Sequence, residues 1–479
     1  MSPKQFPWRK ALRYTLIALV SIAVLAAILV AVETCRSKWA WEKYRHELEA
    51  SGVQFDLSAF TPPVPAKDNF AETPLFKPLF EGDEAARKQA EEALRNRLRL
   101  VPAREGMGRP RGGWMTGKKV DLASWGDYLG NADVLAALQK FEPELAEISE
   151  AAKRPACRFP LKREKGIITA VPHLEPMMDL ASILRLRSFA ELQAGQTDRA
   201  LADVETLLRL DELTTDPPFL ITALVRVSNL SLSLQPIWQG VASHRWSEAQ
   251  LETLQQRLQA IDWLKGIYNA LQGERAAGVL YLEAVAVNNG EFLPSACDES
   301  SVLGGWSGRI GKRIFCYQNL IAYNQAYENL LLPMVDPGQR RFHPDRAAEI
   351  VQFGTSRDPY RAMAAQSVSV LNSALVRFAA GQTYLDEAVI ACALERHRLG
   401  HGSYPERLEA LVPRYLASLP HDLMTGGPPK YRRTEGGGYL IYSVGWNGTD
   451  EGGEVVMKQP GACAVDVEKG DWVWKVPGV

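Results

Sequence analysis

The longest apolar stretch of the chain runs from Tyr14 to Val32, where nineteen consecutive residues carry no charge. At about 1.5 Å per residue, a helix of this length nearly crosses a hydrocarbon core of roughly 30 Å. Several basic residues and no acidic residue precede it, which favours a cytoplasmic N-terminus. We therefore expect a cytoplasmic tail over 1–13 and a transmembrane anchor over 14–34. A cleaved signal peptide is the alternative, although the run is long for one and no clear small-residue cleavage site follows it.

Polar residues return after the apolar stretch. Residues 36–50 continue a helical pattern, and Trp39 and Trp41 fit an aromatic belt at the far membrane interface. Three prolines within 62–65 then remove backbone donors and favour extended geometry. A charged helix and a loop rich in glycine and arginine follow. We expect a tether and irregular region over 35–130.

From about residue 131 the apolar positions recur with helical spacing. Around Gly195 the pattern predicts two antiparallel helices joined by a short turn, because glycine is the residue that most readily ends a helix in the left-handed conformation. Thr197 or Asp198 is expected to cap the second helix. Its apolar face is formed by Leu201, Val204, Leu207 and Leu208.

Further helices follow with the same kind of start signal. Ser247 stands three residues before Gln250, which is the spacing of a capping box. We expect a helical domain over 131–380, arranged as a solenoid or a bundle. The segment 177–213 loosely resembles one tetratricopeptide repeat, with Ala200 packed into the first helix, but no sustained repeat period accompanies it.

The period of the pattern changes after residue 399. The stretches 437–445 and 470–477 alternate apolar with polar or small residues, as strands do. We expect a small α+β domain over 381–479. The predicted fold class is thus mainly α, with an N-terminal transmembrane helix and a small C-terminal α+β domain.

Charge and cysteine content narrow the function classes. The formal net charge is −1 and no block of lysine and arginine stands out, so the sequence does not predict a nucleic-acid partner. Six cysteines are present without a Cys-x-x-Cys pair, which argues against zinc-ribbon and thioredoxin-like chemistry. Cys297 and Cys316 could close a disulfide outside the cytoplasm, or the thiols could be reduced and buried.

Familiar catalytic motifs are incomplete in this chain. The glycine-rich stretch 112–119 has Lys118, but Lys119 stands where a phosphate-binding loop needs serine or threonine. The glycines around Ser307 lack the spacing of a nucleophile elbow. We therefore nominate no catalytic residue. A hydrolase whose site is assembled from scattered acidic and histidine residues remains the alternative to a binding protein.

The stretch "YLIYSVGWNGTDEGG" leads from an apolar strand into a loop with many oxygen atoms. Asn447 and Asp450 are its candidate metal ligands, because Ca²⁺ takes several oxygen ligands from side chains and carbonyls. An ordinary polar turn without an ion explains the same residues. The twelfth position of an EF-hand counted from Asn447 is Lys458, so that motif does not fit.

The order of features over 385–476 resembles the globular domain of the major pseudopilin of type II secretion systems. A helix ending in "GHGSYP" leads to "LEALVPRYLASLPHD", then to the strand and loop above, and finally to "GDWVW". The resemblance implies a helix packed on a short antiparallel sheet. It also implies calcium binding by Asn447, Asp450 and Asp471. Ala18 stands where pseudopilins carry the glutamate used in assembly, so filament formation is not implied.

These observations predict a membrane-anchored extracytoplasmic protein with a binding or scaffolding role. Its expected partners are the lipid bilayer and proteins of the cell envelope, in association with a type II secretion or pilus-like assembly. The expected location is a bacterial-type inner membrane, crossed once, with the bulk of the chain on the periplasmic side. Helical hairpins favour this interpretation because they stack into concave docking surfaces.

Overall fold

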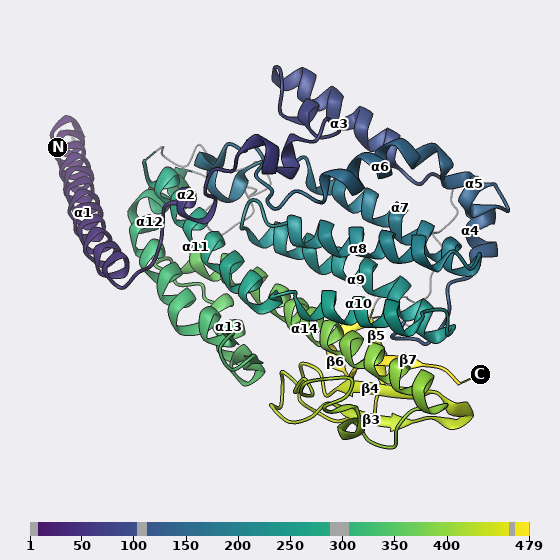
Figure 1. Ribbon diagram of the computed structural model, residues 1–479. Coiled ribbons are helices and arrows are strands. Elements are labelled where there is room, and N and C mark those ends of the chain that lie inside the picture. The colour runs from purple at the N-terminus through teal and green to yellow at the C-terminus, as the bar shows by residue number, and fades with distance from the viewer. Residues whose placement is uncertain (1–7, 103–112, 288–305, 459–464, 479) are drawn as a thin grey trace, which may run out of the picture.

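The computed structural model describes the chain except for residues 1–7, 103–112, 288–305, 459–464 and 479. It is mainly helical, with small antiparallel sheets in the C-terminal part, as the sequence predicts (Figure 1). Its α-helices are α1 (Trp8–Ala50), α2 (Leu57–Phe60), α3 (Glu84–Leu98), α4 (Leu122–Leu129), α5 (Val134–Leu138), α6 (Glu142–Ala151), α7 (Leu174–Gln193), α8 (Thr197–Leu213), α9 (Leu220–Ala242), α10 (Glu248–Gln259), α11 (Trp263–Val287), α12 (Trp306–Ala326), α13 (Ala347–Gly354) and α14 (Ala362–His401).

Helix α1 has two halves with opposite surroundings. In the first half the leucine side chains are exposed; Leu16 and Leu29, for example, are 62% and 61% exposed. In the second half α1 packs against α12, and Trp41 and Leu48 are buried. The Trp41 indole donates to a carboxylate oxygen of Glu283 at 2.9 Å. Trp41 therefore belongs to the protein core rather than to the expected aromatic belt, whereas Trp39 is exposed.

Two described helices are long and apolar enough to cross a membrane by length and composition. The first is the exposed part of α1 from Leu12 onward, of which none of the apolar window is buried. The second is α9, whose window is 61% buried. The burial of α9 is that of a core helix, because α7, α8 and α14 pack around it.

The hairpin of α7 and α8 confirms the expected pair of helices. Gly195 has a φ of +75° in the turn between them, and the predicted apolar positions Val204, Leu207 and Leu208 are buried. The cap prediction is wrong, because Gln196 precedes the first helical residue of α8 and no side chain caps this end. The capping box of α10 is confirmed, with Ser247 and Gln250 bonded reciprocally.

The segment after the prolines differs from the expected tether. Phe70 and Phe76 are fully buried and their rings lie 5.5 Å apart. They belong to a hydrophobic cluster that includes residues of α6 and α7. The three prolines lie within only four residues, and the aromatic residues beyond them gain free energy by burial against the helices.

Helix α14 joins the helical part to the C-terminal sheet. It packs against α9 and α10 on one side and contacts β4 and β7 on the other (Figure 1). The strands of this region are β3 (Lys430–Arg433), β4 (Tyr439–Ser443), β5 (Val455–Met457), β6 (Val465–Gly470) and β7 (Trp472–Val476). A further pair, β1 (Val335–Asp336) and β2 (Arg341–Phe342), precedes α13.

The main sheet has the strand order β3-β4-β7 and is antiparallel throughout. Tyr439 pairs with Val476 and Ser443 with Trp472. Every residue of β4 is buried, in agreement with its apolar character on both faces. Strands β5 and β6 form a separate antiparallel pair.

Candidate functional site

A cleft of about 440 Å³ lies between α2, α9, α11 and the turn that precedes α9. Its volume is in the range of small-molecule sites. The lining contains both apolar and polar residues. It consists of Ala59, Phe60, Arg158, Thr214, Thr215, Pro217, Pro218, Phe219, Thr222, Ala223, Arg226, Gly266, Asn269 and Ala270.

Arg226 is held in the cleft wall from several directions. Its Nε donates to the Asp211 carbonyl oxygen at 3.1 Å, and its Nη2 donates to the Asp211 carboxylate at 3.2 Å. The guanidinium also lies over the ring of Trp263, 5.0 Å from the centroid. Asp211 is completely buried; burial raises its pKa to about 6, and the charge of Arg226 opposes that rise.

Gly266 of α11 makes room for this arginine. A Cβ atom at Gly266 would lie 2.6 Å from Nη1 of Arg226, which is closer than real contacts allow. A larger residue would therefore displace the guanidinium. The absence of a side chain at Gly266 is part of how the site is built.

The first turn of α9 adds polar groups to the cleft. Thr222 is 2% exposed, and within the part of the chain that the structure describes its hydroxyl has no hydrogen-bond partner. The Leu220 N–H donates to Glu274 at 2.8 Å, and the Ala223 N–H donates to the Phe219 carbonyl. Phe219, Thr222 and Ala223 line the cleft, so the N-terminal turn of α9, where the helix dipole is positive, borders it.

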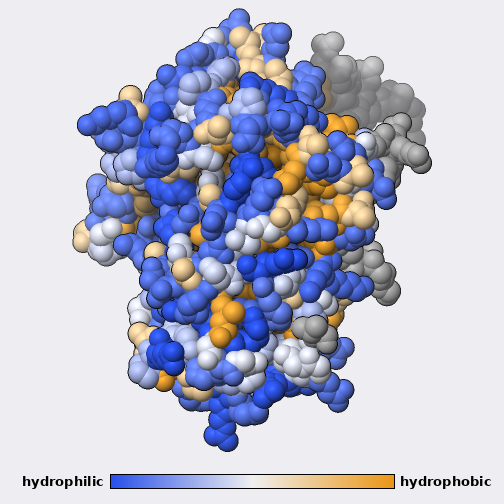
Figure 2. All heavy atoms as spheres, turned by 45° about the vertical axis from the view of Figure 1, so that its right-hand side comes forward, coloured by the Kyte–Doolittle hydropathy of each residue, from blue (hydrophilic) through white to orange (hydrophobic). Residues whose placement is uncertain are grey.

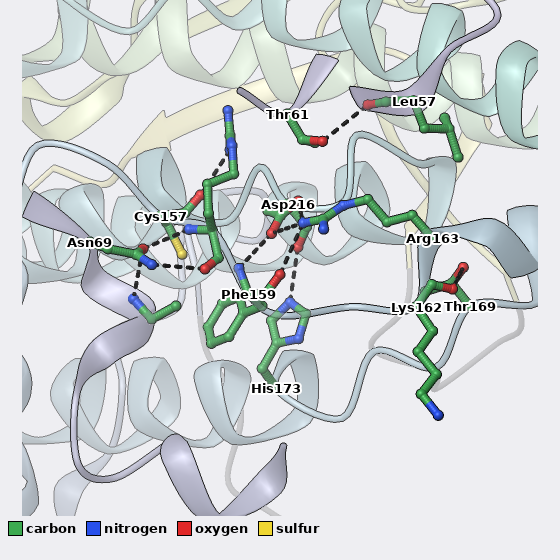
Figure 3. Close-up of polar contacts among 12 residues, drawn as sticks. Leu57, Thr61, Asn69, Cys157, Phe159, Lys162, Arg163, Thr169, His173 and Asp216 are labelled. Atoms are coloured by element: carbon green, nitrogen blue, oxygen red, sulfur yellow. Dashed lines mark hydrogen bonds and ion pairs between the residues drawn. The ribbon is translucent and has the colours of Figure 1, made fainter. Parts of the chain in front are cut away.

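Asp216 organises the wall beside the cleft (Figure 3). Its carboxylate accepts hydrogen bonds from the Phe159 N–H at 2.6 Å and from Nη2 of Arg163 at 2.7 Å. Its carbonyl oxygen lies 3.0 Å from Nε2 of His173. Asp216 is thus a buried carboxylate with a complete set of donors.

His173 lies under this wall as a neutral ring. Its imidazole stacks on Phe159 with centroids 3.9 Å apart and is almost entirely buried. Burial lowers the pKa of His173 to about 3, despite the bond to the Asp216 carbonyl. We assign it a packing role, because it does not line the cleft.

Asn69 lies on the other side of this wall (Figure 3) and is bonded to the backbone of Arg158. The Asn69 side-chain oxygen accepts from the Arg158 N–H at 2.8 Å, and the Asn69 amide donates to the Arg158 carbonyl at 2.9 Å. Nη1 of Arg158 donates to the Cys157 carbonyl at 2.8 Å. The Arg158 backbone is therefore fixed while its guanidinium lines the cleft.

The three predicted calcium ligands each have partners within the protein. Asp450 accepts from the Tyr442 hydroxyl at 3.1 Å and lies 3.4 Å from Nζ of Lys430. Asn447 donates to Glu451 at 2.7 Å. In the described ranges no group of three or more His, Cys, Asp or Glu residues could hold a metal ion.

Asp471 closes the same loop without an ion. Its two carboxylate oxygens accept from the Gly453 N–H at 2.6 Å and from the Glu451 N–H at 3.4 Å. It is 1% exposed, and burial, with the neighbouring Glu451 carboxylate, raises its pKa to about 6. These contacts make Asp471 the residue that shapes the loop, so the calcium interpretation stays a prediction.

A second buried acidic group lies between α14 and the C-terminal part. Glu387 is 2% exposed, and neither of its carboxylate oxygens has a hydrogen-bond partner among the residues that the structure describes. It borders a cavity of about 10 Å³, together with Asp386, His421, Asp422 and other residues. Burial raises the pKa of Glu387 well above its usual value, and the charges of Asp422 and Asp386 add to the rise. This cavity has room for a single water molecule.

Comparison with known proteins finds no matching family model, no matching curated protein and no matching solved structure.

Sequence reasoning did not find the cleft. Its polar residues come from segments that are far apart in the chain, around 158, 214–226 and 266–269. The one local signal was the "DPPF" turn, which marks the start of α9 but gives no indication of a ligand.

Proposed function

We propose that this protein is a single-pass, membrane-anchored binding protein whose body stands outside the cytoplasm. The observation that carries the proposal is the continuity of α1. Its exposed apolar half requires an apolar environment about as thick as a bilayer. Its second half is fixed to the body because Trp41 and Arg45 both donate hydrogen bonds to Glu283.

The rest of the surface supports this division. Figure 2 shows a face of the body on which hydrophilic side chains predominate. In α1, by contrast, large apolar residues are exposed on every side between Leu12 and Val32. A helix that is hydrophobic all round requires an apolar environment, and the body does not supply it.

The cleft favours binding over hydrolysis. Its charged lining residues are Arg158 and Arg226, rather than carboxylates placed for acid–base work. Carboxylates do gather around Glu387, but that cavity of about 10 Å³ cannot admit a substrate. The envelope hydrolase alternative therefore has less support than a binding role.

The C-terminal region extends the proposal toward an envelope assembly. The ring of Tyr404, two residues beyond the Gly402 end of α14, contacts Tyr439 of the sheet at 4.7 Å. A long helix packed on a short antiparallel sheet is the arrangement that the pseudopilin resemblance implies. We propose, on this basis, association with a type II secretion or pilus-like assembly at a bacterial-type inner membrane.

Membrane extraction tests the anchor. We expect the full-length chain to stay in the membrane pellet after alkaline carbonate washing. The variant Leu19→Arg/Leu25→Arg should move to the supernatant, because each arginine near the centre of a spanning helix costs about 2.5 to 3.5 kcal/mol. A matched variant with arginine at the exposed Val351 and Val370 should stay in the pellet. Wild-type protein in the supernatant would refute the proposal.

Cysteine labelling tests the orientation. Cys35 follows the apolar stretch and is exposed, whereas Cys157, Cys316 and Cys392 are buried free thiols. Cys297 and Cys463 lie outside the described residues, so they are replaced by serine. We expect a membrane-impermeant maleimide to label Cys35 in intact spheroplasts. Labelling only after lysis would place the body in the cytoplasm.

A further inference from the structure

We propose that the cleft binds a small organic carboxylic acid, with its carboxylate against Arg226 and Thr222 and its apolar part against Phe60 and Pro218. The proposal deepens the binding role proposed above and rests on it. It is carried by a built polar pocket rather than by the cleft volume alone.

Arg226 supplies the first element of this pocket. It is 7% exposed, and Asp211, Trp263 and Gly266 fix its position. Asp211 uses Nε and Nη2, which leaves Nη1 for another acceptor. A fixed guanidinium is a preferred partner for a carboxylate, because its donors are planar and pre-organised.

Thr222 supplies the second element and points to a ligand independently. Thr222 lines the cleft and is almost entirely buried, and its hydroxyl has no partner among the described residues. A buried hydroxyl without a hydrogen bond costs about 1 to 3 kcal/mol. A ligand oxygen at this position would remove the cost, and the N-terminal turn of α9 would add favourable electrostatics for an anion.

Charge balance selects a monoanion over a phosphate dianion. Among the residues that line the cleft, the charged ones are two arginines. The charge of Arg226 is matched by Asp211, whereas Arg158 has no ion pair among the described contacts. One uncompensated positive charge therefore faces the ligand.

The apolar part of the lining determines the rest of the ligand. It consists of Ala59, Phe60, Pro217, Pro218 and Ala270, among others. An inorganic ion would leave this surface uncovered, whereas an organic acid covers it and gains about 25 cal/mol per Å² of buried area. Aliphatic or aromatic acids of small to medium size match both parts of the lining.

Calorimetric titration of the full chain in detergent tests the proposal. The probes are hexanoate and 4-phenylbutyrate, each compared with its neutral amide. We expect the acids to bind at least about tenfold more tightly than the amides, because only a carboxylate pairs with arginine. Equal affinity of acid and amide for both pairs would overturn the carboxylate assignment.

Variants locate the binding in the cleft. Thr222→Val keeps the shape of the side chain and should weaken acid binding about tenfold, in line with the loss of one hydrogen bond to a charged group. Arg158→Gln should weaken it as well. Thr206→Val on the exposed face of α8 is the matched control and should bind like the wild type. Unchanged binding in Thr222→Val would overturn the proposal.

Two further measurements separate the possible sources and failures. Palmitate presented in phosphatidylcholine vesicles tests a membrane source, and we expect it to compete less well than the soluble acids because the cleft of about 440 Å³ is short for a long chain. Palmitate that displaces 4-phenylbutyrate at lower concentration would overturn the assignment to a small acid. Carbonate extraction is independent of these titrations, so a failure of ligand binding leaves the anchor proposal standing.

Discussion

Asp216 and Glu387 are both buried carboxyl groups, but the structure accommodates them in opposite ways. Asp216 beside the cleft is 1% exposed and accepts bonds from the Phe159 N–H and the Arg163 guanidinium. Glu387 under the C-terminal part has no hydrogen-bond partner. Burial of a charge is costly unless donors replace the lost water. Asp216 has such donors, whereas burial without them raises the pKa of Glu387 well above its usual value.

The two regions also differ in the groups that surround these carboxyl groups. The donors around Asp216 come from the segment 158–163 and fix the wall of the cleft. Around Glu387 the neighbours are the acidic groups Asp386 and Asp422, and the Arg340 guanidinium nearby is bonded to Asp386 at 2.8 Å. The donors thus fix the wall beside the cleft, whereas the raised pKa of Glu387 leads us to expect that the stability of the second region depends on pH.

The largest effect is expected from Asp216→Ala. The substitution leaves the Arg163 guanidinium, which is 22% exposed, without its carboxylate and the Phe159 N–H without its acceptor. Removal of one partner of a buried ion pair costs about 3 to 5 kcal/mol. Urea unfolding should show this loss. Glu212→Ala, at a partly exposed ion pair four residues away, is the control and should cost less than about 1 kcal/mol. Equal losses of stability in the two variants would contradict the expectation that the buried Asp216 ion pair contributes more than a partly exposed one.

Glu387→Gln should change the pH dependence of stability. The raised pKa of Glu387 means that the folded state keeps a proton that the unfolded state releases above about pH 4.5. The stability that this proton confers is complete below that pH and is lost as the pH rises toward the folded pKa. The wild type should therefore lose about 1.4 kcal/mol per pH unit between about pH 5 and 6 that the variant does not lose.

Urea unfolding at several pH values checks this expectation, with Asp386→Asn and Asp422→Asn as companions. Both companion variants remove a negative charge that raises the pKa of Glu387. They should reduce the pH dependence in part, whereas Glu387→Gln should remove it. Parallel curves for the wild type and Glu387→Gln would mean that Glu387 has a partner in solution.

The elements with a local signal could be predicted from the sequence. The uncharged run predicted the exposed half of α1, Gly195 predicted the turn of the α7–α8 hairpin, and the Ser247 and Gln250 pair predicted the start of α10. Each of these depends on residues within one or two turns of helix. The predicted cap of α8 is wrong because the backbone becomes helical at Thr197. Gln196 therefore holds the cap position, rather than either of the two polar candidates.

The cleft could not be predicted in the same way. Asp216 meets Arg163 across 53 residues and Phe159 across 57 residues, and such pairs depend on how the helices pack. For the predicted metal ligands of the C-terminal loop, closeness in sequence was misleading. Asn447 and Asp450 are neighbours in sequence, but Asp450 turns toward Tyr442 and Lys430 while Asn447 turns toward Glu451. Proximity along the chain did not determine which partners these side chains bond.

Asp471 is intermediate between the two carboxyl groups and gives the smallest expected effect. It has two N–H donors, yet its pKa is raised to about 6, so the loop loses stability as the pH rises through that value. Asp471→Asn replaces one acceptor oxygen by an amide that faces an N–H, and should lower the free energy of unfolding by about 1 kcal/mol at pH 7.

Melting scans with millimolar calcium and with a chelator use the same variant. A bound ion at 100 times its dissociation constant would add about 2.7 kcal/mol. Because Asp450 is held by Lys430 and Asp471 by the loop N–H groups, we expect the midpoints with and without calcium to coincide. A calcium-dependent rise that Asp471→Asn abolishes would show instead that the loop rearranges around an ion, as the pseudopilin resemblance predicts.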